Sequence, residues 1–558
     1  MKPTAVIARR PLVGLAAAFV AGTAVGLLGG HAPAVVAGWL AVAGVWIASR
    51  RVARLFRLQD ALAVLLALVT GWLAAAGATD RRRADLAWVE ACSRAEQTTV
   101  VGTVSGDVEA RPLKRGGASY RFALRQVAVE APGAAPRALG RMALGVVWYG
   151  PLPSAAAGTD GVLPACGERW RFTGDLQMRS GLLRKVRLTL GRVRQRDSVR
   201  LAPASLRDFG TLCDRARQVA ARRLARGLEG WGAVPSLVQA MFLGTRSEIP
   251  RELGRVFRDS GTIHIFAISG MNVALLAVVL IAVLSVLGVP RTWWVVPLAP
   301  LLFFYTAVTG LSASALRACL MAVLYFGAPL LGRRPDGLST LAAAAVVALA
   351  ADPFQLQDAG FALSFVVMGG LLLVFPPLSE IFRRRLRVDD AALDAAAAGR
   401  QGGELAPAAR RGYSLRVAGR RYLADLAAMS VAAWLASTPL TAWYFGRITP
   451  GSLLANLPIA PAAFFVGVAS CVGLLTGLVS AWVGGVFNAA AGGLTQGMVW
   501  VAQATVAVPG LVWNVPPPAL WQVGLWYAAI LLFTRWLWRV ARPPAAGAEW
   551  LEAVRDGR

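Results

Sequence analysis

Apolar segments long enough to cross a lipid bilayer recur along this chain from end to end. A helix needs about 20 mostly apolar residues to span the hydrocarbon core. The recurrence predicts a polytopic α-helical membrane protein of about twelve spans. The candidate spans are Leu12–Gly29, Ala34–Ala48, Ala61–Ala78, His264–Leu287, Trp293–Thr309, Ala313–Leu331, Leu338–Ala351, Gly360–Pro376, Ala427–Phe445, Leu453–Leu478, Ala481–Val508 and Leu520–Val540.

The composition agrees with this fold class and excludes two others. The chain is 56% hydrophobic and 16% charged, whereas soluble domains carry about 25% charged residues. It nevertheless holds 58 Lys and Arg against 30 Asp and Glu, a formal net charge of +28. A disordered basic protein would be poor in apolar residues, and a water-soluble nucleic-acid binder would lack the apolar segments.

Basic residues near the ends of the spans predict the orientation, because short cytoplasmic loops are enriched in Lys and Arg. The clusters place both termini in the cytoplasm. The first apolar segment lacks a small-residue cleavage site and is interpreted as a retained span. The clusters are Lys2–Arg10, Arg50–Arg57, Arg291, Arg333–Arg334, Arg383–Arg387 and Arg535–Arg542.

A water-compatible insert between about Asp80 and Pro235 interrupts the apolar segments and is expected outside the cytoplasm. Short runs of alternating apolar residues between Gly and Pro turns predict strands, and five or six such strands suit a small OB-like β-barrel. The expected strands are Thr98–Val104, Tyr120–Val129, Ala143–Trp148, Trp170–Leu176 and Val186–Val193.

The charge of this insert suggests a polyanionic ligand. Residues 80–230 carry 27 basic and 14 acidic residues, a net charge of +13. Long translocated domains largely escape the positive-inside rule, so topology does not explain the excess. Barrels of this kind bind single-stranded nucleic acid through a basic groove and aromatic side chains that stack on the bases. Alternatively, the aromatic side chains fill the barrel core. The candidate DNA-binding residues are Arg121, Arg125, Arg169, Arg171, Tyr120 and Trp170.

The cysteines leave a disulfide open. Cys92 and Cys166 both fall in the expected outer domain, where a disulfide persists, and their pairing is the preferred one. Cys213 falls there too, so this pairing is not forced. Cys319 and Cys471 lie in apolar spans and are expected as small core residues.

Several enzymatic chemistries are excluded by residue content. His31 and His264 are the two histidines of the chain, so no His-rich zinc site is expected. No phosphate-binding loop of the GxxxxGK[ST] type is present. We therefore expect no catalytic site, no metal and no cofactor, with an intramembrane hydrolase built on His264 and Ser269 as an alternative.

Polar residues within the apolar segments are candidates for a polar path, since such groups usually face a bundle interior or water. Arg317 is the most costly of them and has two alternatives: it meets a phosphate, or it pairs with Asp358 or Asp352. Asp358 can also cap a helix. The candidates are His264, Ser269, Asn272, Arg317, Asp358, Ser364 and Asn456, the last beside Pro458 and Pro461 in an expected helix break.

Three ordered segments resemble the ComEC family of competence DNA-uptake channels. The first runs from Met241 through Phe257-Arg258-Asp-Ser-Gly-Thr-Ile-His264 to Asn272, where the family often has His. The second contains Arg317, Leu331-Gly-Arg-Arg-Pro335 and Asp358-Ala-Gly-Phe-Ala-Leu-Ser364. The third contains Ser437-Thr-Pro-Leu440 and Leu454-Ala-Asn456.

The resemblance implies four parts: N-terminal membrane helices (1–79), an outer OB-like domain (80–235), a competence-type membrane core (236–510), and a last span with a cytoplasmic tail (511–558). It implies passage of single-stranded DNA through the bacterial inner membrane into the cytoplasm during natural transformation, in contact with membrane lipid. A separate DNA receptor, a helicase and a separate nuclease are the implied partners, because relatives carry a C-terminal metallo-β-lactamase-like nuclease that is not expected here. A homo-oligomer is also open. The alternative from another class is a permease or exporter of another polyanion or small solute.

Overall fold

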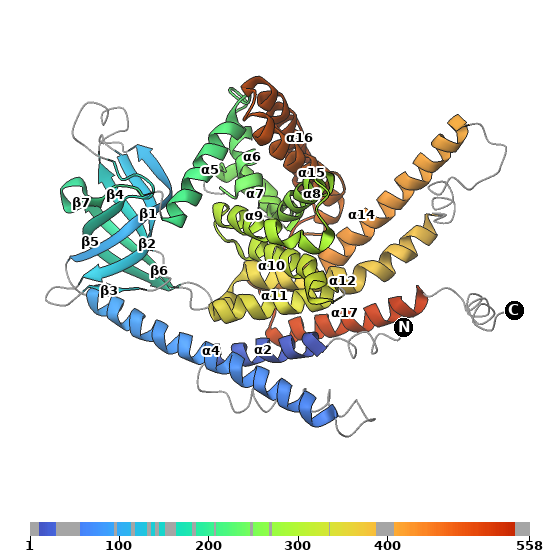
Figure 1. Ribbon diagram of the computed structural model, residues 1–558, viewed down its shortest axis with the longest axis horizontal. Helices are drawn as coiled ribbons and strands as arrows, with labels where there is room; N and C mark the ends of the chain where they lie inside the picture. The colour runs from blue at the N-terminus through green and yellow to red at the C-terminus, as the bar shows by residue number, and fades with distance from the viewer. Residues whose placement is uncertain are drawn as a thin grey trace.

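The computed structural model places a β-barrel at one end of a large group of helices (Figure 1). The description that follows covers residues 11–28, 56–93, 97–112, 118–130, 136–139, 144–150, 163–180, 186–205, 208–245, 249–266, 270–333, 335–386 and 407–541.

Five strands of the insert close into a barrel, and two short strands extend it. The order around the barrel is β1-β2-β4-β6-β5, and β5 pairs with β1 to close it. All these pairs are antiparallel except β4 with β6, which is parallel. The strands are β1 (Thr98–Pro112), β2 (Ala118–Glu130), β3 (Arg137–Ala138), β4 (Leu144–Gly150), β5 (Arg169–Ser180), β6 (Val186–Arg194) and β7 (Ser198–Ala202).

Alternation in the sequence explains which side chains fill the barrel. In β4, Leu144, Val146 and Trp148 are buried, whereas the residues between them are more exposed. Side chains on a strand point alternately to its two faces, so one set fills the interior and the other covers the surface. All five strands expected from the sequence are present, which confirms the small barrel.

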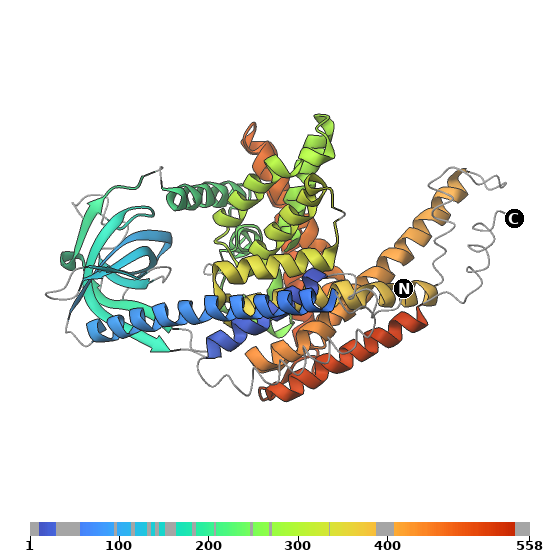
Figure 2. The same cartoon turned by 60° about the horizontal axis from the view of Figure 1, so that its bottom comes forward.

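Two helices join the barrel to the rest of the chain. α4 (Phe56–Ser93) runs 38 residues without a break and buries Val89 and Cys92 in the barrel core. α5 (Phe209–Ala225) leaves the barrel towards the helical region, and Figure 2 shows both helices bridging the two parts.

Most of the apolar segments expected to span the membrane coincide with helices. The candidate Ala34–Ala48 lies outside the described residues. The remaining helices are α2 (Pro11–Leu28), α6 (Val234–Leu243), α7 (Arg251–Asp259), α8 (Gly270–Val286), α9 (Val295–Val308), α10 (Ala313–Gly327), α11 (Gly337–Ala351), α12 (Ala359–Arg385), α14 (Pro407–Phe445), α15 (Ser452–Thr476), α16 (Ala481–Ala507) and α17 (Leu520–Val540). Of these, α6 and α7 precede the His264–Leu287 candidate and match no expected span.

Four segments of the described chain are both long and apolar enough to cross a membrane. They are Ala313–Leu331, Ala359–Arg385, Val417–Phe445 and Ser452–Thr476. Shorter apolar helices accompany them, among them Gly270–Val286 and Gly337–Ala351. The molecule is thus mostly helical with four candidate spans and a five-stranded barrel, and the total of about twelve spans stays a prediction.

Glycines allow α2 and α4 to pack with their backbones nearly touching. A Cβ on Gly22 would lie 2.1 Å from the Leu68 carbonyl oxygen, and a Cβ on Gly71 would lie 2.4 Å from the Phe19 carbonyl oxygen. Small residues at such interfaces are typical of helix pairs in membranes.

The helix break expected near Asn456 is wrong. α15 continues from Ser452 to Thr476 with Pro458 and Pro461 inside it. Proline removes one backbone donor, but neighbouring groups in a membrane bundle can satisfy the freed carbonyls, so a continuous helix tolerates it.

Candidate nucleic-acid interface and the polar centre of the helices

Two of the aromatic residues predicted to stack on DNA instead fill the barrel. Tyr120 and Trp170 are 2% and 3% exposed. The Tyr120 ring lies 5.2 Å from that of Trp148, and the Trp170 ring stacks 5.8 Å from that of Phe172. Both rings therefore belong to the hydrophobic core, and the prediction that they contact DNA is wrong.

Arg125 also has a structural role, because it fastens the barrel to α5. Its Nη2 donates to Asp208 Oδ2 at 2.6 Å and to Thr211 Oγ1 at 3.0 Å. Its Nη1 lies 3.5 Å from the carboxylate of buried Asp214. A Cβ on Gly210 would lie 1.6 Å from that same Nη1, so a larger residue there would displace the guanidinium of Arg125. These contacts use the charge of Arg125 within the protein and leave little of it for DNA.

Replacing Arg125 by glutamine is expected to loosen this joint. Among the described residues, Asp214 would keep Arg217, whose nearest nitrogen is 4.0 Å away, and the Ser105 hydroxyl, which donates at 3.5 Å. Removing one partner of a buried ion pair costs about 3–5 kcal/mol, and the partial exposure of Arg125 favours the low end. Hydrogen exchange of the α5 and β2 amides in the full chain measures the loss. Arg121→Gln, four residues earlier on the same strand, is the control; equal exchange in both variants would contradict the assignment.

A different face of the barrel has the features of a nucleic-acid interface. The register places Arg121 of β2 opposite Val147 of β4, and Tyr149 of β4 opposite Arg194 of β6. These side chains share the outer surface, where Tyr149 is 39% exposed and both arginines are exposed. No ion pair joins either arginine to another described residue, although Glu109 of β1 lies opposite Arg121 in the register. We call Arg121, Tyr149 and Arg194 the barrel face.

Arg169 and Arg171 lie on another part of the barrel surface. Both are exposed on β5, opposite Thr103 and Val101 of β1. Arg171 lies 3.6 Å from the Glu130 carboxylate. Of the six residues predicted to bind DNA, the structure therefore brings only Arg121 onto the barrel face. Tyr149 and Arg194 were not among the six, although alternation from buried Trp148 would have placed Tyr149 outside.

The preferred disulfide does not form in this structure. All five cysteines lie in the described part of the chain and are free. Cys92 belongs to the barrel core, whereas Cys166 lines an open cleft between the barrel and α5. Burial, with the nearby Asp214 carboxylate second, raises the pKa of the Cys166 thiol to about 12. This thiol is therefore protonated at neutral pH, the form that is least able to exchange.

Arg317 lies in the polar centre of the helices without an acidic partner in the described part of the chain. Its side chain is buried on α10, with the residue 6% exposed. Nη1 donates to the Ser364 carbonyl oxygen of α12 at 3.0 Å, while Nε has no hydrogen-bond partner. A Cβ on Gly270 of α8 would lie 3.1 Å from Nη2. Three helices thus enclose a positive charge that no described carboxylate compensates, and the buried Ser364 hydroxyl has no partner among these residues either.

The two aspartates considered as partners of Arg317 act as helix caps instead. Asp358 Oδ1 accepts from the Gly360 amide at 2.7 Å at the start of α12, and Asp352 Oδ1 accepts from the Phe354 amide at 3.1 Å. The ion-pair alternative for Arg317 is therefore wrong. Asn456 of α15 carries a buried carbonyl oxygen without a hydrogen-bond partner.

Asn272 and His264, two of the polar-path candidates, lie in different elements. Asn272 Nδ2 donates to the Met241 carbonyl oxygen at 2.6 Å, which fastens α8 to α6. His264 lies in a 3₁₀ turn, Ile263–Phe266, with an exposed ring nitrogen 3.2 Å from the Gly261 carbonyl oxygen. Ser269 lies outside the described residues, so a Ser–His arrangement stays a prediction.

Metal-ligand chemistry has no cluster to support it in the described residues. No group of three or more His, Cys, Asp or Glu side chains there is close enough to hold an ion.

Comparisons with known proteins identify the helical part. A family model described as competence protein matches residues 241–540, which is more than half of the chain. ComE operon protein 3 of Bacillus subtilis (strain 168) is 33% identical over 137 residues, 25% of this chain and 18% of that protein. The uncharacterized protein YcaI of Escherichia coli (strain K12) is 27% identical over 149 residues, 25% of this chain and 19% of that protein. These alignments cover less than a fifth of either relative.

Proposed function

Because the chain belongs to the competence protein family, the ComEC family that its motifs resemble, we propose that it is a channel for single-stranded DNA. The channel would lie in the bacterial inner membrane and pass the strand into the cytoplasm. The observation that carries this proposal is the family match over residues 241–540, which contain the polar centre around Arg317.

The barrel supports a DNA-receiving role outside the membrane. Its strand order, with β4 and β6 as one parallel pair in an otherwise antiparallel barrel, suits an OB-like fold. OB-folds bind oligonucleotides over the face of their second and third strands, which here are β2 and β4. Arg121 and Tyr149 of the barrel face lie on these two strands, and Arg194 lies beside them on β6. The face combines an exposed ring with two arginines, as base stacking and phosphate contact require.

The polar centre supports a path for a polyanion through the helices. A charged side chain at the centre of a membrane helix costs about 2.5–3.5 kcal/mol. Arg317 has no carboxylate within the described residues to offset this cost. A guanidinium matches phosphate geometry with several donors, so a passing phosphate would supply the missing negative charge.

The arrangement of the ends is compatible with the proposed direction. The barrel lies at one end of the molecule, and the last turn of α12, with Arg383 and Arg385, points to the opposite end together with the end of α17 (Figure 1). Basic residues mark the cytoplasmic side of membrane proteins. We propose about twelve spans, both termini in the cytoplasm, no catalytic activity of this chain, and work with a DNA receptor, a helicase and a separate nuclease.

Binding and uptake together test the proposal. The purified full chain in neutral-lipid nanodiscs is expected to bind single-stranded DNA with an affinity that falls steeply as salt rises, because phosphate contacts release counterions. A strain without this chain is expected to lose uptake of labelled DNA. Normal uptake in that strain, or no binding at low salt, would refute the DNA-channel function.

A further inference from the structure

Helix α5 is the connection between the barrel and the helices that follow it. At its first turn, Asp208 and Thr211 bind Arg125 of the barrel. At its other end, Asn488 Nδ2 of α16 donates to the carbonyl oxygens of Arg223 and Arg226 at 2.9 and 3.0 Å. Figures 1 and 2 show the helix crossing from one part to the other. A nucleic-acid strand that moved from the barrel to the helical bundle along this connection would pass close to α5.

One side of α5 carries a row of cationic and polar side chains. Arg215, Gln218 and Arg222 are spaced by three or four residues, which places them along one side of α5, and Arg226 is the cap residue that follows the last turn of this helix. The three arginines are exposed, and no ion pair joins any of them to another described residue. From Arg215 to Arg226 the row extends about 16 Å, at about 1.5 Å per residue. We call these four residues the α5 row.

The acidic groups nearby leave the charge of the row uncompensated. Asp208 and Asp214 are turned to Arg125. Glu168 accepts from Arg200 at 2.9 Å and from the Trp170 indole nitrogen at 2.8 Å, so its charge is already balanced. Glu229, beyond the end of α5, is the remaining exposed carboxylate close in sequence.

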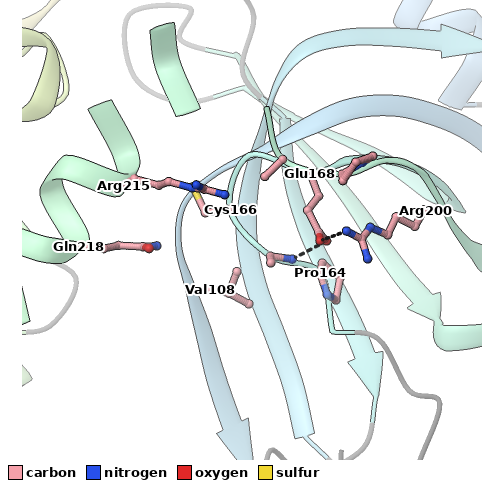
Figure 3. A pocket seen from close by; sticks show the side chains of 10 residues that line it. Val108, Pro164, Cys166, Glu168, Arg200, Arg215 and Gln218 are labelled. Carbon is pink, nitrogen blue, oxygen red and sulfur yellow. Dashed lines mark hydrogen bonds and ion pairs between the residues drawn. The ribbon is translucent and has the colours of Figure 1, made fainter. Parts of the chain in front are cut away.

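The row begins in an open cleft on the barrel. The cleft has a volume of about 550 Å³ and is lined by Arg215 and Gln218 from α5 and by Cys166, Glu168 and Arg200 from the barrel side. Figure 3 shows Arg215 and Gln218 reaching from the helix towards the barrel residues. A polyanion entering here would meet donors from both parts of the molecule.

We infer that the α5 row is a phosphate-binding track that carries single-stranded nucleic acid from the cleft at the barrel to the helical bundle. The inference rests on the proposed function and adds a site to it. A row of arginines without ion pairs to other described residues fits a backbone with regularly repeated phosphates. Phosphate contacts carry no sequence information, so the track would be indifferent to sequence.

Two double variants with the same change in net charge test the track. Arg215→Gln with Arg222→Gln removes two unpaired cations of the row. Arg192→Gln with Arg196→Gln is the matched control, because these exposed arginines already face Asp175 at 3.4 Å and Asp197 at 3.7 Å. The full chain in neutral-lipid nanodiscs is titrated with a fluorescein-labelled oligothymidylate over a range of salt concentrations.

Each lost phosphate contact lowers the slope of log affinity against log salt by about 0.7 for single strands. The row variant is therefore expected to lose about 1.4 of slope, and the control clearly less. Wild-type binding with equal slopes in both variants would overturn the track and leave the proposed function standing. No wild-type binding would refute the DNA function itself. A row variant that loses only its binding to vesicles with anionic lipid would make the row a lipid contact and overturn the inference.

Discussion

Replacing Arg317 by methionine is expected to reduce DNA uptake roughly ten- to a hundredfold. Hydrogen bonds to a charged group contribute about 1.5–3 kcal/mol, and each 1.4 kcal/mol is about a tenfold change. In the protein, this guanidinium has one backbone acceptor, Ser364, and no carboxylate partner among the described residues. Uptake of labelled DNA into cells, normalised to the amount of protein in the membrane, is the measurement.

Protein stability separates this transport role from a structural one. Removing an uncompensated buried charge is often neutral or stabilising, whereas removing one partner of a buried pair is strongly destabilising. Arg317→Met is therefore expected to keep or raise the thermal unfolding midpoint while it reduces uptake. Arg317→Lys keeps the charge but loses the planar fork, and intermediate uptake is expected. A large loss of stability in Arg317→Met, with uptake lost in proportion, would assign Arg317 to structure.

The sequence predicted the elements of this fold well because each rests on local pattern. Alternation located all five barrel strands, and the apolar segments coincide with helices such as α10, α11 and α15. The predicted helix break at Pro458 was wrong because the sequence shows only that proline removes a backbone donor. The carbonyl groups that are thereby freed can be satisfied by tertiary neighbours, which the sequence does not show. The number of membrane spans depends on which helices lie in the lipid, and the local sequence pattern does not determine this.

The candidate sites were harder to predict because the decisive partners are distant in sequence. Arg125 looked like a free cation, but Asp208, which binds it, is 83 residues further along the chain. The caps formed by Asp352 and Asp358 are local, and the sequence offered the second of them as an alternative. Arg317 has no acidic partner in the described chain because of how three helices pack around it. The residues next to Arg317 in the sequence could not predict this.

Trp148 and Tyr149 provide a paired test of the barrel face, because adjacent residues on one strand point to opposite sides. Trp148 is fully buried, its indole nitrogen donates to the Ser198 hydroxyl at 3.1 Å, and its ring packs on Tyr120. Trp148→Ala is expected to cost about 3–5 kcal/mol of barrel stability. Hydrogen exchange of the barrel amides in the full chain measures this cost.

Tyr149→Ala is expected to leave barrel exchange close to that of the wild type and to weaken binding of single-stranded DNA. Stacking of a base on an aromatic ring is worth about 1–3 kcal/mol, which is roughly a 5- to 150-fold loss of affinity. Tyr149→Phe keeps the ring and is expected to bind nearly as well as the wild type. If the alanine and phenylalanine variants bind alike, the ring does not stack. Phosphate contacts by Arg121 and Arg194 would then account for binding on this face. The strand register places Arg194 opposite Tyr149, and Arg121 opposite Val147, two residues earlier on the same strand.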